Sequence, residues 1–327
     1  MRRRTLMLAP MAALARPGPA LAFPDRTITM ATGYAPGGST DVAARILSER
    51  MAAQLGSDVR IVIDNRPGAA GAVATEWLKR QPADGHTLMV TETGAAAVAP
   101  NALIGGTRYD PVADFTQIGN VSQPPLILIT TERFPGRTPQ EVLAHLRSAP
   151  AESLTYASSG VGGVLHLLSE LLAQTLGARF VHVPYRSGAQ MVQAILTGEA
   201  QFGIAALAYA TPLLREGRVR GIAMIGQRRF PLYPDIPTMA EIGIRGFDDG
   251  GFFMLIAPAN LPPQTAAALN RALNASLAEP AVRERMINAG HLPPEGPNAL
   301  ESTRDYMAQQ VAYYRMVVER TGVRLQP

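Results

Sequence analysis

The sequence predicts an α/β protein made of two successive β/α units and a helical tail. Three observations lead to this prediction. Short runs in which apolar residues recur with the period of a strand alternate with longer runs in which they recur with the period of a helix. In both halves of the chain a loop rich in glycine and serine separates a strand from the next helix. The length of 327 residues suits two domains, since one domain usually takes roughly 100–200 residues.

The first unit is expected to form a parallel sheet covered by helices. Its elements are, in order, a strand at 27–32, a helix with Val42, Ile46, Leu47, Met51 and Leu55 on one face, a strand at 59–63, a helix at 70–81 and a strand at 86–91. Ser39, Thr40 and Asp41 suit the start of the first helix, because their side-chain oxygens accept hydrogen bonds from its first N–H groups. Strands that alternate with helices in this way are typical of parallel sheets.

The second unit repeats the pattern before the chain returns to the first. We expect strands at 126–130, 154–157, 180–183, 201–206 and 219–225, and helices at 139–148, after residue 163 and at 189–196. From residue 237 on we expect a short helix, a strand at 252–257 and three further helices. Crossings near 122–125 and 221–225 would divide the chain into lobes. The first lobe would hold 23–122 and 225–327, and the second lobe 123–224.

The excess of basic over acidic residues comes entirely from the first 22 residues. These contain Arg2, Arg3, Arg4 and Arg16 and no acidic residue, and the rest of the chain carries 26 basic and 26 acidic residues. A neutral body has no surface for a nucleic-acid backbone, so we expect no nucleic-acid partner.

Residues 1–22 have the pattern of a secretory signal peptide. Three arginines precede a short apolar stretch, and Ala20-Leu21-Ala22 supplies the small residues of a cleavage site after about Ala22. The apolar stretch is too short to span a bilayer, which needs about 20 residues. Arg3-Arg4 leaves twin-arginine export open, and a cytosolic N-terminus is the remaining alternative.

Motifs for catalysis, metals and cofactors are absent from the sequence. Without cysteine the chain has no disulfide and no thiolate site. Lys79 is the only lysine and stands outside any phosphate-binding loop motif. The five histidines lack zinc-helix spacing, and no Gly-x-Ser-x-Gly elbow occurs. We therefore expect no catalytic residue, no metal and no cofactor.

The two strand-to-helix loops are the strongest candidate for a binding site. They comprise residues 34–39 and 158–163. The start of a helix offers unpaired N–H groups and a partial positive charge, which bind a carboxylate or phosphate without a basic side chain. With one loop in each lobe, an anion would be held from both sides.

An ordered series of motifs resembles the Bug family, also called TctC, the extracytoplasmic solute receptors of tripartite tricarboxylate transporters. The matching motifs are Tyr34-Ala35-Pro36-Gly37-Gly38-Ser39-Thr40-Asp41, Asp64-Asn65-Arg66-Pro67-Gly68-Ala69, Asp84-Gly85-His86-Thr87-Leu88, Tyr109-Asp110-Pro111, Tyr156-Ala157-Ser158-Ser159-Gly160, His182-Val183-Pro184-Tyr185-Arg186 and Asp235-Ile236-Pro237-Thr238. The resemblance implies a type II periplasmic-binding-protein fold, with two lobes and a ligand cleft between them. It also implies a periplasmic location, a membrane permease as partner and a small organic carboxylate as ligand.

The resemblance places the ligand between the two loops and the surrounding walls. The implied ligand-binding residues are Tyr34, Ala35, Pro36, Gly37, Gly38, Ser39, Thr91, Ser158, Ser159, Gly160, Gly162, Gly163, His166, Tyr185, Arg186, Ser187, Ala205, Ala206 and Phe252. Asp41 is expected to help cap the start of its helix or to brace its lobe, and Arg66 to anchor its turn through a carboxylate. For His166 a place in the core is the alternative to a ligand contact.

The resemblance also implies that the residues after the strand at 201–204 bear on the ligand, because members that bind amino acids often have an acidic or amide residue there. Ala205-Ala206-Leu207-Ala208 offers no acceptor for an ammonium group, and burying an unpaired ammonium is costly. A dicarboxylate, a tricarboxylate or an aromatic acid is therefore favoured over an amino acid. We expect a monomer. Two rival functions remain. One is an exported α/β enzyme that uses His166 or His182 near Ser158 and Ser159, and the other is a receptor that serves a sensor protein.

Overall fold

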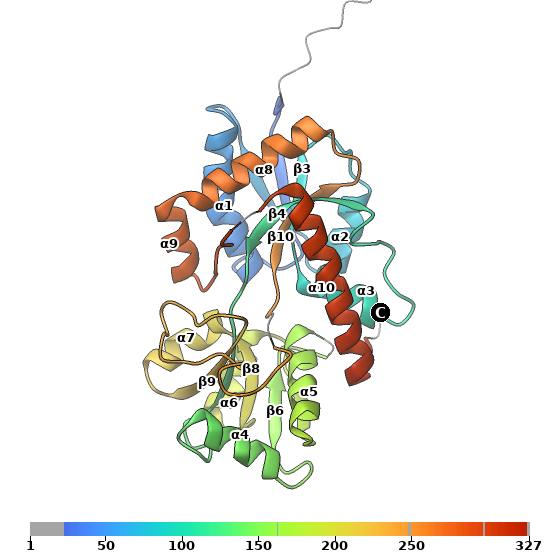
Figure 1. Ribbon diagram of the computed structural model, residues 1–327. Coiled ribbons are helices and arrows are strands. Elements are labelled where there is room, and N and C mark those ends of the chain that lie inside the picture. Colours follow the sequence, from blue (N-terminus) through green and yellow to red (C-terminus); the bar gives the residue numbers. More distant parts are fainter. Residues whose placement is uncertain (1–22, 162, 248–249, 297, 326–327) are drawn as a thin grey trace, which may run out of the picture.

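The computed structural model describes residues 23–161, 163–247, 250–296 and 298–325. These residues form two α/β lobes, each built on a five-stranded sheet (Figure 1). No helix in these ranges is both long and apolar enough to cross a membrane. The predicted signal peptide at 1–22 and Gly162 lie outside the described residues.

The first sheet has the strand order β2-β1-β3-β10-β4. Its strands are β1 (Ile28–Thr32), β2 (Ile61–Asn65), β3 (Thr87–Glu92), β4 (Phe115–Ser122) and β10 (Phe253–Pro258). Strand β1 runs parallel to β2 and β3, whereas β10 runs antiparallel to β3 and β4. This sheet therefore combines a parallel β/α unit with one strand that arrives from the other lobe.

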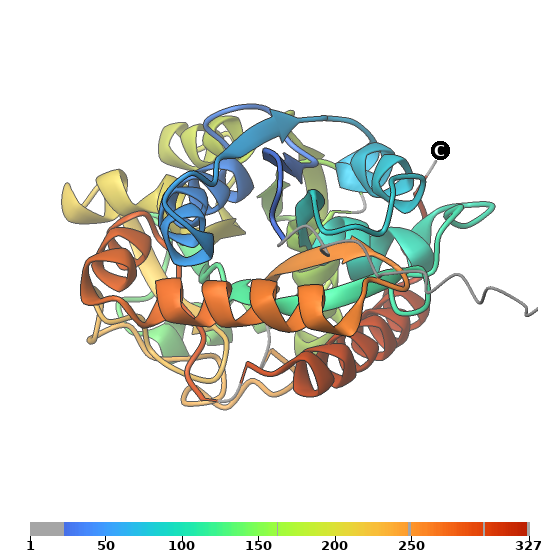
Figure 2. The same cartoon turned by 90° about the horizontal axis from the view of Figure 1, so that it is seen from above.

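Helices cover both faces of the first sheet (Figure 2). One face packs against α1 (Ser39–Leu55), α8 (Pro263–Ala278) and α9 (Pro280–Asn288). The other packs against α2 (Ala72–Lys79), a π-helical turn η2 (Gly94–Val98), α3 (Ala99–Ala102) and α10 (Leu300–Thr321). Strands β1 and β3 are buried on both faces, and their central residues are accordingly apolar, Met30-Ala31 in β1 and Leu88-Met89-Val90 in β3.

The second sheet has the strand order β7-β6-β8-β5-β9. Its strands are β5 (Leu126–Thr131), β6 (Thr155–Ser158), β7 (Val181–Pro184), β8 (Phe202–Ala206) and β9 (Val219–Ile225). The helices of this lobe are α4 (Pro139–Ser148), α5 (Val164–Leu176), α6 (Gly188–Thr197) and α7 (Leu207–Arg215). Strand β5 enters from the first lobe and runs antiparallel to β8 and β9, as β10 does in the first sheet. The two lobes thus share one architecture.

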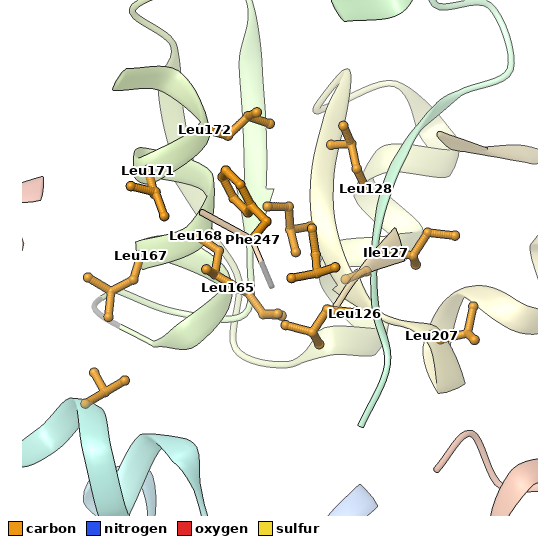
Figure 3. Packing of buried hydrophobic residues seen from close by; sticks show 14 of the residues in the cluster. Leu126, Ile127, Leu128, Leu165, Leu167, Leu168, Leu171, Leu172, Leu207 and Phe247 are labelled. Carbon is orange, nitrogen blue, oxygen red and sulfur yellow. The ribbon is translucent and has the colours of Figure 1, made fainter. Parts of the chain in front are cut away.

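The segment that follows β9 packs against the second lobe. Its backbone bonds back to β9, from Gly226 N to Phe247 O (2.9 Å) and from Met224 N to Pro237 O (2.8 Å). Phe247 lies in the buried core between the leucines of α5 and strand β5 (Figure 3). The lobe division predicted from sequence stays a prediction. Because these hydrogen bonds tie the segment to the second lobe, we propose that this lobe extends to about residue 247.

Four elements were not predicted from sequence, and one predicted helix is wrong. The missed elements are η2, α3, β4 and α7. The short helix expected after residue 237 is only a turn, in which Thr238 and Glu241 bond each other's backbone N–H groups (3.2 and 2.7 Å). Gly243, with φ of +84°, ends that turn before a helix can grow. The helix expected at 70–81 starts at Ala72, because Gly71 adopts a left-handed φ of +88°.

Candidate functional site

The first loop, between β1 and α1, is held by the buried carboxylate of Asp41. This carboxylate accepts hydrogen bonds from Gly37 N (2.9 Å), Arg45 Nε (2.9 Å) and Asn65 Nδ2 (3.0 Å). The same Asn65 amide donates to the carbonyl of Tyr34 (3.0 Å). Asp41 therefore braces the loop from within, whereas the start of α1 has no side-chain cap.

The electrostatics of Asp41 favour its charged form. Burial alone would raise the pKa of Asp41, but the hydrogen bonds from Arg45, Gly37 and Asn65 outweigh it and the pKa is lowered. Helix α1 begins after Gly38 without a side-chain cap. Since Asp41 reaches back to Gly37, the N–H groups of the first turn of α1 remain available to an anionic ligand.

Tyr34 is tied to the end of β3. Its hydroxyl donates to Glu92 Oε1 (2.5 Å), and Glu92 also accepts from Gly94 N (2.8 Å) and Ala95 N (3.0 Å). Burial, followed by the neighbouring Glu92, raises the pKa of Tyr34 well above its usual value. The hydroxyl of Tyr34, one of the implied ligand-binding residues, is thus engaged by the protein. Glu92 was not predicted from sequence.

The second loop starts at Ser158, whose hydroxyl is fully buried at the end of β6. Ser158 Oγ donates to Gly160 O (2.9 Å), accepts from Gly160 N (3.2 Å) and lies 2.6 Å from His182 Nε2. A hydroxyl has one proton and two acceptor sites. Because the proton goes to Gly160, we assign the His182 contact as a bond that His182 donates. The one donor and two acceptor positions of this hydroxyl are then filled by Gly160 and His182.

His182 belongs to a stack of rings beneath the loop. The His182 ring centroid lies 3.9 Å from that of His166 and 4.9 Å from that of Tyr156, and the Tyr156 and His166 centroids lie 6.3 Å apart. The Tyr156 hydroxyl donates to Glu170. Burial lowers the pKa of both histidines to about 4, so both are neutral at pH 7. His166 lies in the core of the second lobe, the alternative that the sequence left open.

The remaining predicted residues fall into exposed and buried groups. The exposed ones are Ala35, Pro36, Gly37, Ser159, Arg186 and Ser187. The half-buried ones are Tyr34, Gly38, Ser39, Gly160, Gly163, Tyr185 and Ala206. The buried ones are Thr91, Ser158, His166, Ala205 and Phe252. Contact of any of these residues with a ligand stays a prediction.

Some of these residues have a clear structural partner. Tyr185 donates its N–H to Ser158 O (2.9 Å), which joins the turn at 185–187 to the second loop. Ser187 caps α6 by accepting from Gln190 N (3.2 Å). The buried Phe252 ring packs edge-on against Tyr306, with 5.6 Å between ring centroids. The Thr91 hydroxyl is buried without a hydrogen-bond partner among the described residues.

A cavity of about 270 Å³ lies at the lobe crossings rather than at the loops. Its lining includes Gln123–Pro125, Gly250 and Gly251, and none of the predicted ligand residues. Since this cavity lies where the chain passes between lobes, we take the loops and not the cavity as the candidate site. Within the described ranges no three His, Cys, Asp or Glu side chains converge to hold a metal ion.

Comparisons with known proteins agree with this architecture. Residues 43–323 match the sequence model of the family described as tripartite tricarboxylate transporter family receptor, TctC. Protein BugT of Bordetella pertussis is 30% identical over 314 residues, which cover 96% of this chain and 95% of BugT.

Two ligand-bound structures from Rhodopseudomonas palustris are similar over most of the chain. MatC with bound malate has a TM-score of 0.77 and 30% identity, covering 90% of this chain and 100% of MatC. Rpa4515 with adipate has a TM-score of 0.81 and 27% identity, covering 93% of this chain and 100% of that one. The fold is therefore that of a two-lobed periplasmic binding protein. The chain belongs to the Bug/TctC family of receptors of tripartite tricarboxylate transporters.

Proposed function

We propose that this protein captures a small organic carboxylate between the loops at 34–39 and 158–163. The observation that carries the proposal is the matched pair of helix starts. Helices α1 and α5 both begin at these loops, after Gly38 and Gly163, without a side-chain cap. Each helix start can therefore donate backbone hydrogen bonds to a carboxylate. The malate and adipate in the similar structures are carboxylates of this kind.

The side chains around the loops favour an acid without an ammonium group. Asp41 and Glu92 are the carboxylates that brace the first loop, and both already accept several hydrogen bonds from the protein. Residues 205–208 at the start of α7 are apolar. An amino acid would leave its ammonium group without a strong acceptor there. We therefore propose a dicarboxylate, a tricarboxylate or an aromatic acid.

Capture is proposed to work by lobe closure. A ligand that bonds to both helix starts does so only when the lobes are closed, so binding shifts the population toward that state. The closed form would deliver its ligand to the membrane permease that the family implies. We place the protein in the periplasm as a monomer, with the signal peptide cleaved after about Ala22.

Catalysis is not part of the proposal. The shorter Ser–His contact at the described part of the candidate site, 2.6 Å between Ser158 and His182, lies in a buried hydroxyl network. A serine nucleophile needs a base that accepts its proton, and in our assignment Ser158 donates to Gly160 O and accepts from His182. We expect any bound carboxylate to be recovered unchanged, which proton NMR of the released ligand would show.

Thermal unfolding against a panel of ligands tests the proposed function. The mature chain, from residue 23, would be melted with dicarboxylates, tricarboxylates and aromatic acids, and with amino acids and sugars as controls. A ligand at 100 times its Kd should stabilise the protein by about 2.7 kcal/mol and raise Tm by a few degrees. Shifts confined to carboxylates support the proposal. A shift with sugars or amino acids alone, or none at all, contradicts it.

A further inference from the structure

His291 joins the first ligand loop to the crossing between the lobes. It follows helix α9 and is fully buried. Its Nε2 atom lies 3.4 Å from the Oγ atom of Ser39, the first residue of α1. Its Nδ1 atom lies 3.2 Å from the Oγ atom of Ser122, the last residue of β4 before the chain leaves the first lobe. One imidazole therefore connects the start of α1 to the crossing.

The chemistry of His291 suits this bridge. Burial lowers its pKa to about 4, so the ring is neutral at pH 7. A neutral imidazole has one N–H donor and one acceptor nitrogen, and a serine hydroxyl can complement either. Both ring nitrogens thus have a partner. An apolar replacement of His291 would leave the buried Ser122 hydroxyl without this bond.

The residues on both sides of His291 contact the crossing and the second lobe. Leu292 and Gln123 exchange two backbone hydrogen bonds, of 2.8 and 3.0 Å. Gly290 packs against Ala208 at the start of α7, and a Cβ at Gly290 would lie 3.1 Å from the Ala208 Cβ. The end of α9 indeed lies directly above α7 (Figure 1). Three consecutive residues therefore contact the crossing, the ligand loop and the opposite lobe.

We propose that residues 290–292 couple lobe closure to the first ligand loop, with His291 as the positioning residue. In the conformation seen here, Gly290 rests on Ala208 while His291 fixes Ser39 at the start of α1. When α7 moves away, the segment loses this support, and Ser39 loses a fixed partner. The test of this proposal by affinity rests on the proposed carboxylate-binding function, whereas its test by hydrogen exchange needs no ligand.

Affinity measurements on histidine variants provide the first test, with a carboxylate that binds the wild-type chain. Removing the bridge in His291→Ala should raise Kd about tenfold, whereas His291→Gln, which keeps a donor and an acceptor, should recover part of the loss. His86→Gln is the matched control, since His86 is buried in the same lobe and bonds Asp84 and Asp25 far from the loop. It should lower Tm and leave Kd within about twofold.

A purely structural role for His291 gives a different pattern. The His291 and His86 variants would then lower Tm and leave Kd unchanged alike, and the proposal would be wrong. If His291→Ala does not fold, Ser122→Ala removes one bond of the bridge and keeps the ring. It should raise Kd by a few fold, and an unchanged Kd in this variant also contradicts the proposal.

Hydrogen exchange of the ligand-free chain provides the second test. Gly290 and Gly243 have nearly the same φ, +80° and +84°, but a Cβ at Gly243 would meet nothing within 4 Å. Both alanine variants carry the same backbone strain, and only Gly290→Ala presses on Ala208. We expect faster exchange of amides 39–43 in Gly290→Ala and wild-type exchange in Gly243→Ala. Equal exchange in the two variants would refute the coupling, even if the wild-type chain binds no carboxylate and the proposed function fails.

Discussion

The two lobes have the same sheet architecture but hold their ligand loops by different means. The first loop is braced by carboxylates, with Asp41 bonded to Gly37 and Glu92 bonded to Tyr34. The second loop rests on stacked neutral rings, with His182 in contact with both His166 and Tyr156. A strand-to-helix loop can therefore be fixed either by charge-assisted hydrogen bonds or by packed rings. The two solutions should respond differently to mutation and to pH.

Among the variants that test this difference between the lobes, removing the Asp41 carboxylate should have the largest effect on stability and affinity. Asp41→Ala removes the acceptor of the Gly37 N–H, one of the three acceptors of the Asn65 amide and the partner of Arg45. We expect a loss of about 2–3 kcal/mol in the free energy of unfolding and a rise of at least tenfold in Kd. Urea unfolding and calorimetry would measure both.

A carboxylate on the same edge of the first lobe serves as the control. Asp64 pairs with Arg66 at 2.7 Å, and both side chains are about one-third exposed (34% and 38%). Asp64→Ala should therefore cost less than about 1 kcal/mol and leave Kd unchanged. If the two aspartate variants behave alike, the carboxylate bracing of the first loop is not specific to Asp41.

Local order was predictable from sequence, and long-range partners were not. Apolar periodicity indicated the two β/α units, and the polar residues at 39–41 indicated the start of α1. Helix α7 was missed because Pro212 lies inside it, where proline normally breaks a helix. The Ser39–His291 contact joins residues 252 positions apart, so it depends on how α9 packs against α1. Glu92 did carry a signal, as a carboxyl at the carboxyl end of a buried strand.

The next largest effect should come from lowering the pH, to which the two lobes should respond differently. Burial lowers the pKa of His166 from 6.5 to about 4, so between these values the unfolded chain binds more protons than the folded one. The contribution of neutral His166 is complete above pH 6.5 and is lost as pH falls toward 4. The hydrogen bonds from Arg45, Gly37 and Asn65 lower the pKa of Asp41 below its usual value, so Asp41 keeps its charge at pH 5.

Urea unfolding at pH 7 and pH 5 checks this difference. In His166→Leu the fall in unfolding free energy between the two pH values should shrink by about 1–2 kcal/mol. In Asp41→Ala the fall should match the wild type. His291 and His182 titrate in the same direction as His166, and Glu92 in the opposite one, so each variant is compared with the wild type rather than read alone. If the fall in unfolding free energy from pH 7 to pH 5 is the same in His166→Leu as in the wild type, burial does not keep His166 neutral in this range.

The smallest effect is expected from removing the side-chain cap of α6, which sets this helix apart from the uncapped helices α1 and α5 at the loops. Ser187 accepts the Gln190 N–H at the start of α6, whereas α1 and α5 begin without a side-chain cap. Ser187→Ala should therefore lower the free energy of unfolding by about 1 kcal/mol and leave Kd within about twofold. Calorimetry that instead shows a tenfold loss of affinity would make Ser187 a ligand contact, as the family resemblance implies. The anion would then be held by the second lobe at the start of α6 as well as at the start of α5.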